Sequence, residues 1–148
     1  MSANEAPPGK WIQVAEESYR RCQGEAFFQS LYQRLLASDA AVRAKFARTD
    51  FSRQNKLLQH GLGLLLIYAK RPNPAMLERI AVCHGQDDLD VPPTQYPLFV
   101  DSLIAAVREH DPQCTPDVEN AWRTSLAPGI AFMAKAYDVK PTQAASDR

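Results

Sequence analysis

Three polar side chains, Tyr32, Gln54 and His84, lie among apolar residues at positions where a polar group needs a partner. His84 ends a short stripe of apolar residues at helical spacing that begins at Leu77. An imidazole there can bind a metal through one ring nitrogen while the other donates to the Ile80 carbonyl, one turn earlier. A phenol and an amide are hydrogen-bond donors and ligate ferrous iron poorly. The set suggests one metal-binding nitrogen facing two donors. The alternative for His84 alone is a core histidine satisfied by a backbone carbonyl.

A long helix that ends near Lys70 positions the second donor. An α-helix turns by about 100° per residue, so residues three or four positions apart point to the same side. The side of this helix that is expected to face the core, its inward sector, contains one polar residue followed by three small or apolar ones. Glycine in this sector lets a bulky planar group approach the backbone closely. A buried amide without a partner is costly, so the polar residue needs a ligand there, unless it is a solvated residue at the helix start. His60 lies well outside the sector and is expected at the surface or between helices. The sector consists of Gln54, Leu58, Gly61 and Leu65.

The composition is that of an ordinary globular protein and excludes several classes of function. The 148 residues are 45% hydrophobic and 23% charged, with a formal net charge of +0. This balance gives no electrostatic reason to expect nucleic acid or an anionic membrane as partner. The longest apolar run, Gly61 to Ala69, is too short to span a bilayer.

The cysteines and the N-terminus favour a cytoplasmic protein. The N-terminal residues lack both a basic start and an apolar core, so no secretory signal is predicted. Cys22, Cys83 and Cys114 are odd in number and widely spaced, which favours reduced thiols over a disulfide framework. Cys83 precedes His84, but no second cysteine completes the Cys-x-x-Cys-His pattern of covalent haem attachment.

Nearly all apolar clusters recur at helical spacing, and no convincing strand or internal repeat is present. Thr49, Asp50 or Ser52 can cap the long helix, and Pro72 and Pro74 are expected to stop it and open a loop. Gly85 is expected to close the short helix, before an acidic loop at 87–90. The predicted helical stripes are Ile12–Cys22, Phe28–Leu36, Val42–Phe46, a long helix to Lys70, Leu77–His84, Tyr96–Val107 and Val118–Tyr137.

The last helix has its own start signal and an internal proline. Thr115 is expected to cap it with Pro116 in the first turn, and Pro128 is expected to bend it. The whole pattern predicts an all-α domain of six to eight helices over residues 10–139. Flexible tails are expected at 1–9 and 140–148.

These segments resemble the globin family, in particular bacterial single-domain globins and the globin domain of flavohaemoglobins. The resemblance covers Trp11 to Tyr137. Leu31 to Phe46 looks like the stretch that carries the distal tyrosine and then the haem-stacking phenylalanine, and Tyr32 and Phe46 are fourteen residues apart, as in the family. The other matching segments are the Gln54 and Leu58 pair, Leu77 to His84, Gln95-Tyr96 and Ala121-Trp122-Arg123.

The resemblance implies a globin fold around a pocket for non-covalently bound haem b. His84 is then the proximal iron ligand, and Tyr32 and Gln54, with Leu58 beside them, form the distal side where a gas binds. In flavohaemoglobins a tyrosine and a glutamate polarise the proximal histidine. Tyr96 matches that tyrosine, whereas no glutamate follows Glu119. The residues expected against the ring are Phe46, Leu58, Gly61, Leu65, Tyr96, Val100 and Leu103.

The function implied by the resemblance is reversible binding of oxygen and related diatomic gases such as carbon monoxide and nitric oxide, as in oxygen storage or transport. The chain is not expected to be an enzyme by itself. The alternative is a nitric oxide dioxygenase served by an external reductase, because no G-x-G-x-x-G stretch for a nicotinamide cofactor is present. A haem gas sensor and a haem-free interaction module are further alternatives, and the chain is expected to be a monomer or homodimer.

Overall fold

The computed structural model describes residues 8–22, 24–84 and 91–138. These residues form seven α-helices and two short 3-10 helices and contain no strand, which confirms the predicted all-α class. None of the described helices is long and apolar enough to cross a membrane. The elements are α1 (Pro8–Cys22), α2 (Glu25–Ser38), α3 (Ala40–Lys45), α4 (Phe51–Lys70), α5 (Pro74–Cys83), η2 (Pro93–Gln95), α6 (Tyr96–His110), α7 (Pro116–Lys135) and η3 (Ala136–Asp138).

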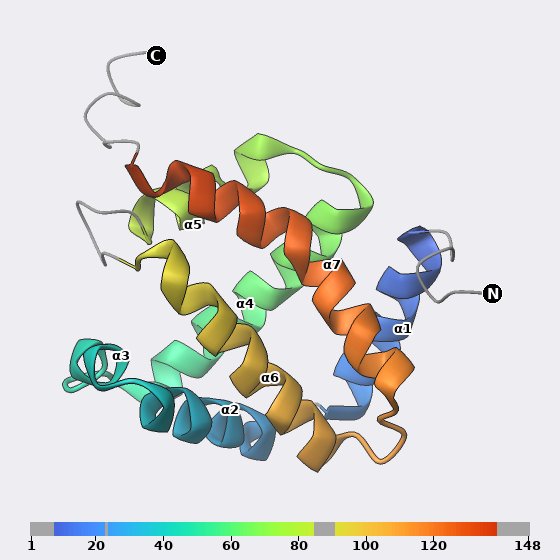
Figure 1. The fold of residues 1–148 in the computed structure, drawn as a ribbon, viewed down its shortest axis with the longest axis horizontal. Coiled ribbons are helices and arrows are strands. Elements are labelled where there is room, and N and C mark those ends of the chain that lie inside the picture. The colour runs from blue at the N-terminus through green and yellow to red at the C-terminus, as the bar shows by residue number, and fades with distance from the viewer. Residues whose placement is uncertain (1–7, 23, 85–90, 139–148) are drawn as a thin grey trace.

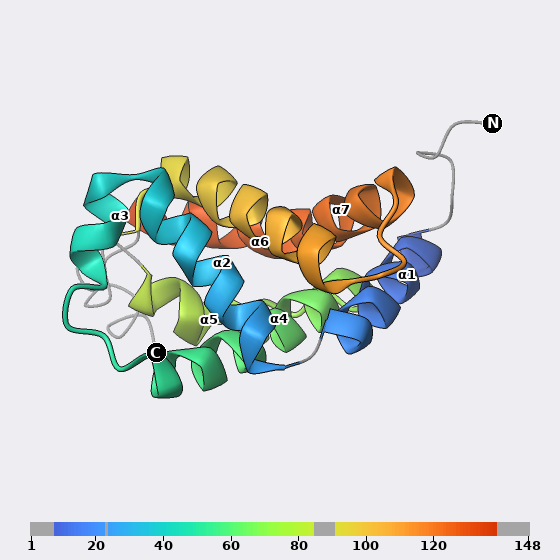
Figure 2. The same ribbon diagram turned by 90° about the horizontal axis from the view of Figure 1, so that it is seen from below.

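The helices form two layers. Figures 1 and 2 show α6 and α7 on one side of the molecule and α4 and α5 on the other, with α2 packed along α6 and α1 along α7. The short α3 projects from the end of α2. This arrangement leaves the end of α5 and the beginnings of α4 and α6 around one end of the fold, where the candidate site lies.

Side-chain caps start three of the helices, as the sequence predicts for two of them. The Asp50 carboxylate accepts hydrogen bonds from the Ser52 and Arg53 N–H groups and thereby begins α4. The Thr115 hydroxyl accepts from the Val118 N–H at 3.2 Å and begins α7. The carboxylate of Asp39 caps α3 in the same way.

Three boundaries differ from the prediction. Pro74 does not extend the loop but is the first residue of α5, where a proline loses no helical hydrogen bond. Tyr137 lies beyond the end of α7, in η3, because the chain tightens into a 3-10 turn after Lys135. α1 begins at Pro8, before the predicted domain start. Gly85, the acidic loop at 87–90 and the tails 1–7 and 139–148 lie outside the described residues.

A glycine brings α7 close to α4. Gly129 is buried in α7, and a Cβ atom placed on it would collide with Cδ2 of Leu65 and touch Cδ1 of Leu77. The missing side chain therefore lets α7 pack directly on α4 and α5. Pro128 lies inside α7 on the exposed side, and its bending effect stays a prediction.

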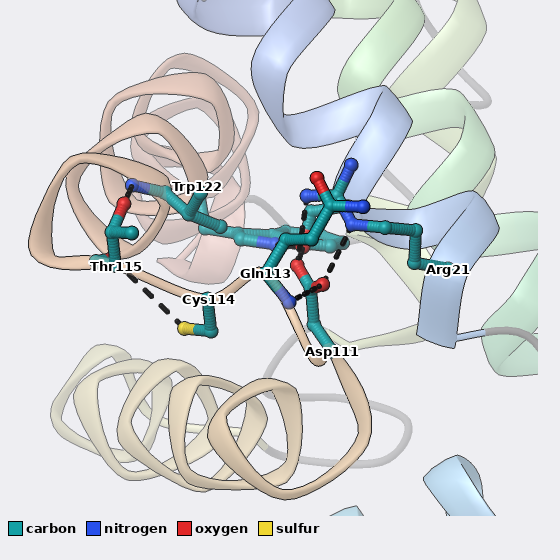
Figure 3. A network of polar contacts seen from close by, with 8 residues as sticks. Arg21, Asp111, Gln113, Cys114, Thr115 and Trp122 are labelled. Atoms are coloured by element: carbon teal, nitrogen blue, oxygen red, sulfur yellow. Dashed lines mark hydrogen bonds and ion pairs between the residues drawn. The ribbon is translucent and has the colours of Figure 1, made fainter.

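A group of linked polar residues, which we call the polar clamp, joins α1, the end of α6 and α7 (Figure 3). It consists of Ser18, Arg21, Asp111, Gln113 and Trp122. Asp111 is 2% exposed and accepts from Ser18 Oγ at 2.7 Å and from Arg21 Nε at 2.6 Å. The indole N–H of Trp122 donates to Ser18 Oγ at 2.9 Å, and the Gln113 N–H donates to Asp111. Every buried polar group of the clamp thus has a partner, as burial requires.

Replacing Asp111 in the polar clamp is expected to lower the stability of the fold. Burial alone raises the pKa of Asp111, but the hydrogen bonds from Arg21, Ser18 and the Gln113 N–H together hold that pKa below its ordinary value. A carboxyl with a lowered pKa stabilises the fold above the unfolded-state value, about 3.9, and this contribution disappears as the pH falls through the folded-state value. We expect Asp111→Asn to lower the free energy of unfolding by about 2 kcal/mol at pH 7, measured by urea unfolding.

The difference between Asp111→Asn and the wild type should shrink as the pH is lowered below about 4. Asp101→Asn is the matched control, because the Asp101 side chain is 66% exposed in its ion pair with Arg123. Equal losses from both substitutions would show that the clamp adds nothing beyond a surface ion pair.

Candidate functional site

His84 follows the last turn of α5 and is half-buried. Its N–H donates to the Ile80 carbonyl at 3.0 Å, and its ring Nδ1 lies 2.8 Å from the same oxygen. A carbonyl oxygen can only accept, so Nδ1 carries the proton and donates. The contact expected from the sequence is therefore present. In the neutral ring, this contact leaves Nε2 as the nitrogen that can bind a metal.

Tyr32 and Gln54 come together from α2 and α4. Tyr32 is 5% exposed and Gln54 is half-buried. Burial raises the pKa of the Tyr32 phenol to about 12, while a side-chain hydrogen bond with Gln54 acts in the opposite direction. The phenol therefore stays neutral over the whole physiological pH range and keeps its proton as a donor.

An aromatic cluster holds the Tyr32 ring in place. The ring centroids of Tyr32 and Phe46 are 5.7 Å apart, and those of Tyr32 and Phe51 are 5.2 Å apart at an interplanar angle of 64°. Phe46 and Phe51 stack at 6.1 Å. Phe51 is a site residue that the sequence prediction missed. Its position three residues before Gln54, directly after the cap Asp50, was the signal available.

The inward sector of α4 faces open space at its glycine. Leu58 and Gly61 are half-buried, and a Cβ atom placed on Gly61 would meet no atom within 4 Å. Leu65, 7% exposed, packs towards Gly129 of α7. His60 is exposed, in agreement with the prediction that it lies off this sector.

The residues expected from α6 lie between its first residue and its middle. Tyr96 is 7% exposed, Val100 is half-buried and Leu103 is completely buried. Burial raises the pKa of Tyr96 to about 12, so its hydroxyl is neutral. Within the described part of the chain, the hydrogen bond of the His84 ring goes to Ile80 and not to Tyr96.

The donor set suits a flat cofactor that brings its own in-plane ligands. The described residues contain no group of three or more His, Cys, Asp or Glu side chains that could hold a bare metal ion. They offer instead one imidazole, that of His84, and several half-buried apolar side chains that pack against the core. These partly exposed side chains include Phe46, Leu58, Ile80, Leu98, Phe99 and Val100.

Comparison with known proteins gives a consistent result. A family model described as Globin matches residues 29–133. The crystal structure of protein PA3967 from Pseudomonas aeruginosa PAO1, described as structurally highly homologous to a human hemoglobin, is similar with 36% identity and a TM-score of 0.83. The match covers 86% of this chain and 98% of that one. A comparison with curated proteins found no match. The chain therefore belongs to the globin family.

Proposed function

We propose that this globin binds haem b without a covalent link and reversibly binds oxygen and other diatomic gases. The observation that carries the proposal is the 2.8 Å contact of His84 Nδ1 with the Ile80 carbonyl, which orients the ring so that Nε2 can bind a metal. The buried phenol of Tyr32 supports it as a hydrogen-bond donor. Membership of the globin family and similarity to a protein described as homologous to a human hemoglobin support it.

His84 would hold the iron through Nε2, with Nδ1 fixed by Ile80. When bound, haem supplies an iron atom whose sixth position accepts a diatomic gas. The open space beside Gly61 accommodates the ring close to the α4 backbone. The apolar neighbours exclude water and thereby slow oxidation of the iron. The ring neighbours that we assign are Phe46, Leu58, Gly61, Leu65, Tyr96, Val100 and Leu103.

Tyr32 and Gln54 give the site its selectivity among gases. Hydrogen-bond donors at these two positions would favour oxygen, a ligand that gains partial negative charge, over carbon monoxide, which stays nearly neutral. A hydrogen bond to a charged group contributes about 1.5–3 kcal/mol, which corresponds to roughly ten- to hundred-fold in affinity. Because the pKa of Tyr32 is raised to about 12, the phenol keeps its donor proton at every physiological pH.

The contacts of His84 favour gas binding over oxidative chemistry. Nδ1 donates to the neutral backbone carbonyl of Ile80, which orients the ring, and among the described residues this ring hydrogen bond goes to no carboxylate. In this proposal, an external reductase supplies the electrons that keep the iron ferrous.

Absorption spectra of the purified protein test the proposal directly. We expect about one haem per chain, a ferrous spectrum that shifts on addition of carbon monoxide, and a stable spectrum under oxygen. Carbon monoxide reports the open sixth position because it competes poorly with a strong protein ligand. A purified protein that is colourless and does not bind added haemin would contradict the proposal. A haem protein whose ferrous spectrum ignores carbon monoxide would end the gas-binding part alone.

A further inference from the structure

The chain is neutral overall, but its positive charge is concentrated in one stretch. Residues 40–77, which include α3, α4 and the start of α5, contain seven Lys and Arg residues and one acidic residue, Asp50. The whole chain has 17 residues of each kind. The Asp50 carboxylate already accepts hydrogen bonds from the Ser52 and Arg53 N–H groups. This stretch therefore carries a positive field that the balanced composition of the whole chain conceals.

The outward side of α4 combines this charge with exposed apolar side chains. Among the described residues, the large apolar side chains that stay exposed are Leu57, at 53%, and Ile67, at 45%. Arg53 stands four positions before Leu57, and Arg71 four positions after Ile67, so the cations and the apolar side chains share one side of the helix. Figure 2 shows α4 on the side of the molecule opposite α6 and α7. We call this surface the α4 face, and it consists of Arg53, Lys56, Leu57, Leu64, Ile67 and Arg71.

The charges of the α4 face have no internal partners. Arg53, Lys56 and Arg71 are exposed and form no ion pair with any described residue, whereas the neighbouring Lys70 pairs with Glu16 at 2.8 Å. The face contains no carboxylate, so a second copy of this chain would bring cations against cations and be repelled. Apolar side chains flanked by unpaired cations therefore fit a partner with an acidic surface.

The α4 face lies beside the candidate cofactor site on the same helix. Arg53 directly precedes Gln54, and Leu57 directly precedes Leu58, and both second members belong to the sector assigned to haem. An α-helix with its side chains is about 10–12 Å across, so a partner on the face stops about one helix width from that sector. Leu57 and Ile67 are only about 15 Å apart along the helix. An apolar area this small suits a short-lived, charge-steered complex, which repeated delivery of electrons requires.

We propose that the α4 face docks an acidic electron-transfer protein, which acts as the external reductase of the proposed function. The proposal rests on that function. One electron passes from the reduced flavin of the donor to the ferric iron, which becomes ferrous, and no atom is transferred. The positive charge of the face speeds the encounter with an acidic donor, and this effect falls as the ionic strength rises. An anionic membrane also matches the charge but supplies no electron, so it is the competing occupant in the test.

Binding of flavodoxin, a small acidic protein that carries a flavin, tests the docking surface. We expect oxidised flavodoxin to shift the methyl signals of Leu57 and Ile67 in the purified protein in a saturable manner, and to leave those of Val118 in α7 unchanged. Arg53→Glu and Lys56→Glu should each weaken this binding about tenfold at low ionic strength. Binding should disappear at an ionic strength of about 1 M, where the Debye length is about 3 Å. Lys10→Glu is the matched control, because Lys10 is exposed in the first turn of α1, at the end of the molecule away from α3 (Figure 2).

The rate of reduction gives a second measurement. Reduction of the ferric protein by reduced flavodoxin should slow about tenfold in Arg53→Glu, whereas reduction by dithionite, a small reductant that needs no docking, should stay unchanged. No shift at Leu57 and Ile67, or an equal loss of binding in Lys10→Glu, would overturn the proposal. Vesicles of phosphatidylserine that shift both signals when flavodoxin does not would overturn it in favour of a membrane. Failure of haem uptake or of carbon monoxide binding would instead contradict the proposed function, so the two failures are distinguishable.

Discussion

His84→Gly should reduce the haem content of the purified protein to about a tenth or less of that of the wild type. The reason is that His84 is the residue whose Nε2 atom the Ile80 contact prepares for iron. The apolar neighbours alone would hold a flat ring without fixing its iron. Haem content is measured from the absorption spectrum after conversion to the pyridine complex, with the unfolding midpoint as a check that the fold persists.

Exogenous imidazole should restore haem binding to His84→Gly, because the small ligand can occupy the space of the lost ring. His60→Gly is the matched control: His60 is exposed on α4, and its loss should leave haem content unchanged. Full haem content in the His84 variant would remove the proximal assignment. Equal losses in both variants would indicate a general effect on folding.

Tyr32→Phe should raise the oxygen dissociation rate by about ten- to hundred-fold. The substitution removes the donor and keeps the ring that packs on Phe46 and Phe51. Carbon monoxide dissociation should change much less, because that gas carries little charge for a donor to stabilise. Stopped-flow displacement of oxygen by carbon monoxide measures the effect.

Tyr68→Phe is the control for loss of a buried hydroxyl, since Tyr68 lies in α4 against Phe132 and away from Gln54. An unchanged oxygen dissociation rate in Tyr32→Phe would mean that the phenol donates elsewhere. A rise by the same factor for both gases would point to a looser pocket and away from a lost hydrogen bond.

Local signals in the sequence predicted most of the fold. Asp50 and Thr115 are capping residues that act on N–H groups two or three positions away, so their effect is readable along the chain. The Ile80 contact of His84 spans one helical turn and was predictable for the same reason. Pro74 shows the weakness of such signals, because a proline can either extend a loop or begin a helix, and here it begins α5.

Contacts across the fold were beyond the reach of the sequence. Ser18 and Asp111 are separated by 93 positions, and no sequence pattern around either residue indicates that the two are in contact. Phe51 lies at the start of α4, where the sequence signals concern helix capping. Its place in the aromatic cluster depends on stacking with Phe46 from the preceding segment. The family resemblance relates Tyr32 to His84, 52 positions further along the chain, because it carries a three-dimensional arrangement that periodicity lacks. The joint role of these two residues stays a prediction.

Gly129 has a consequence for how this protein can vary. Any side chain at that position competes for volume with the methyl groups of Leu65, so the two positions are not free to change independently. A larger side chain at position 129 becomes acceptable only when a smaller side chain replaces Leu65 in the same lineage. Since Leu65 also lies in the α4 sector assigned to the ring, drift in the last helix would be transmitted to the shape of the cofactor pocket.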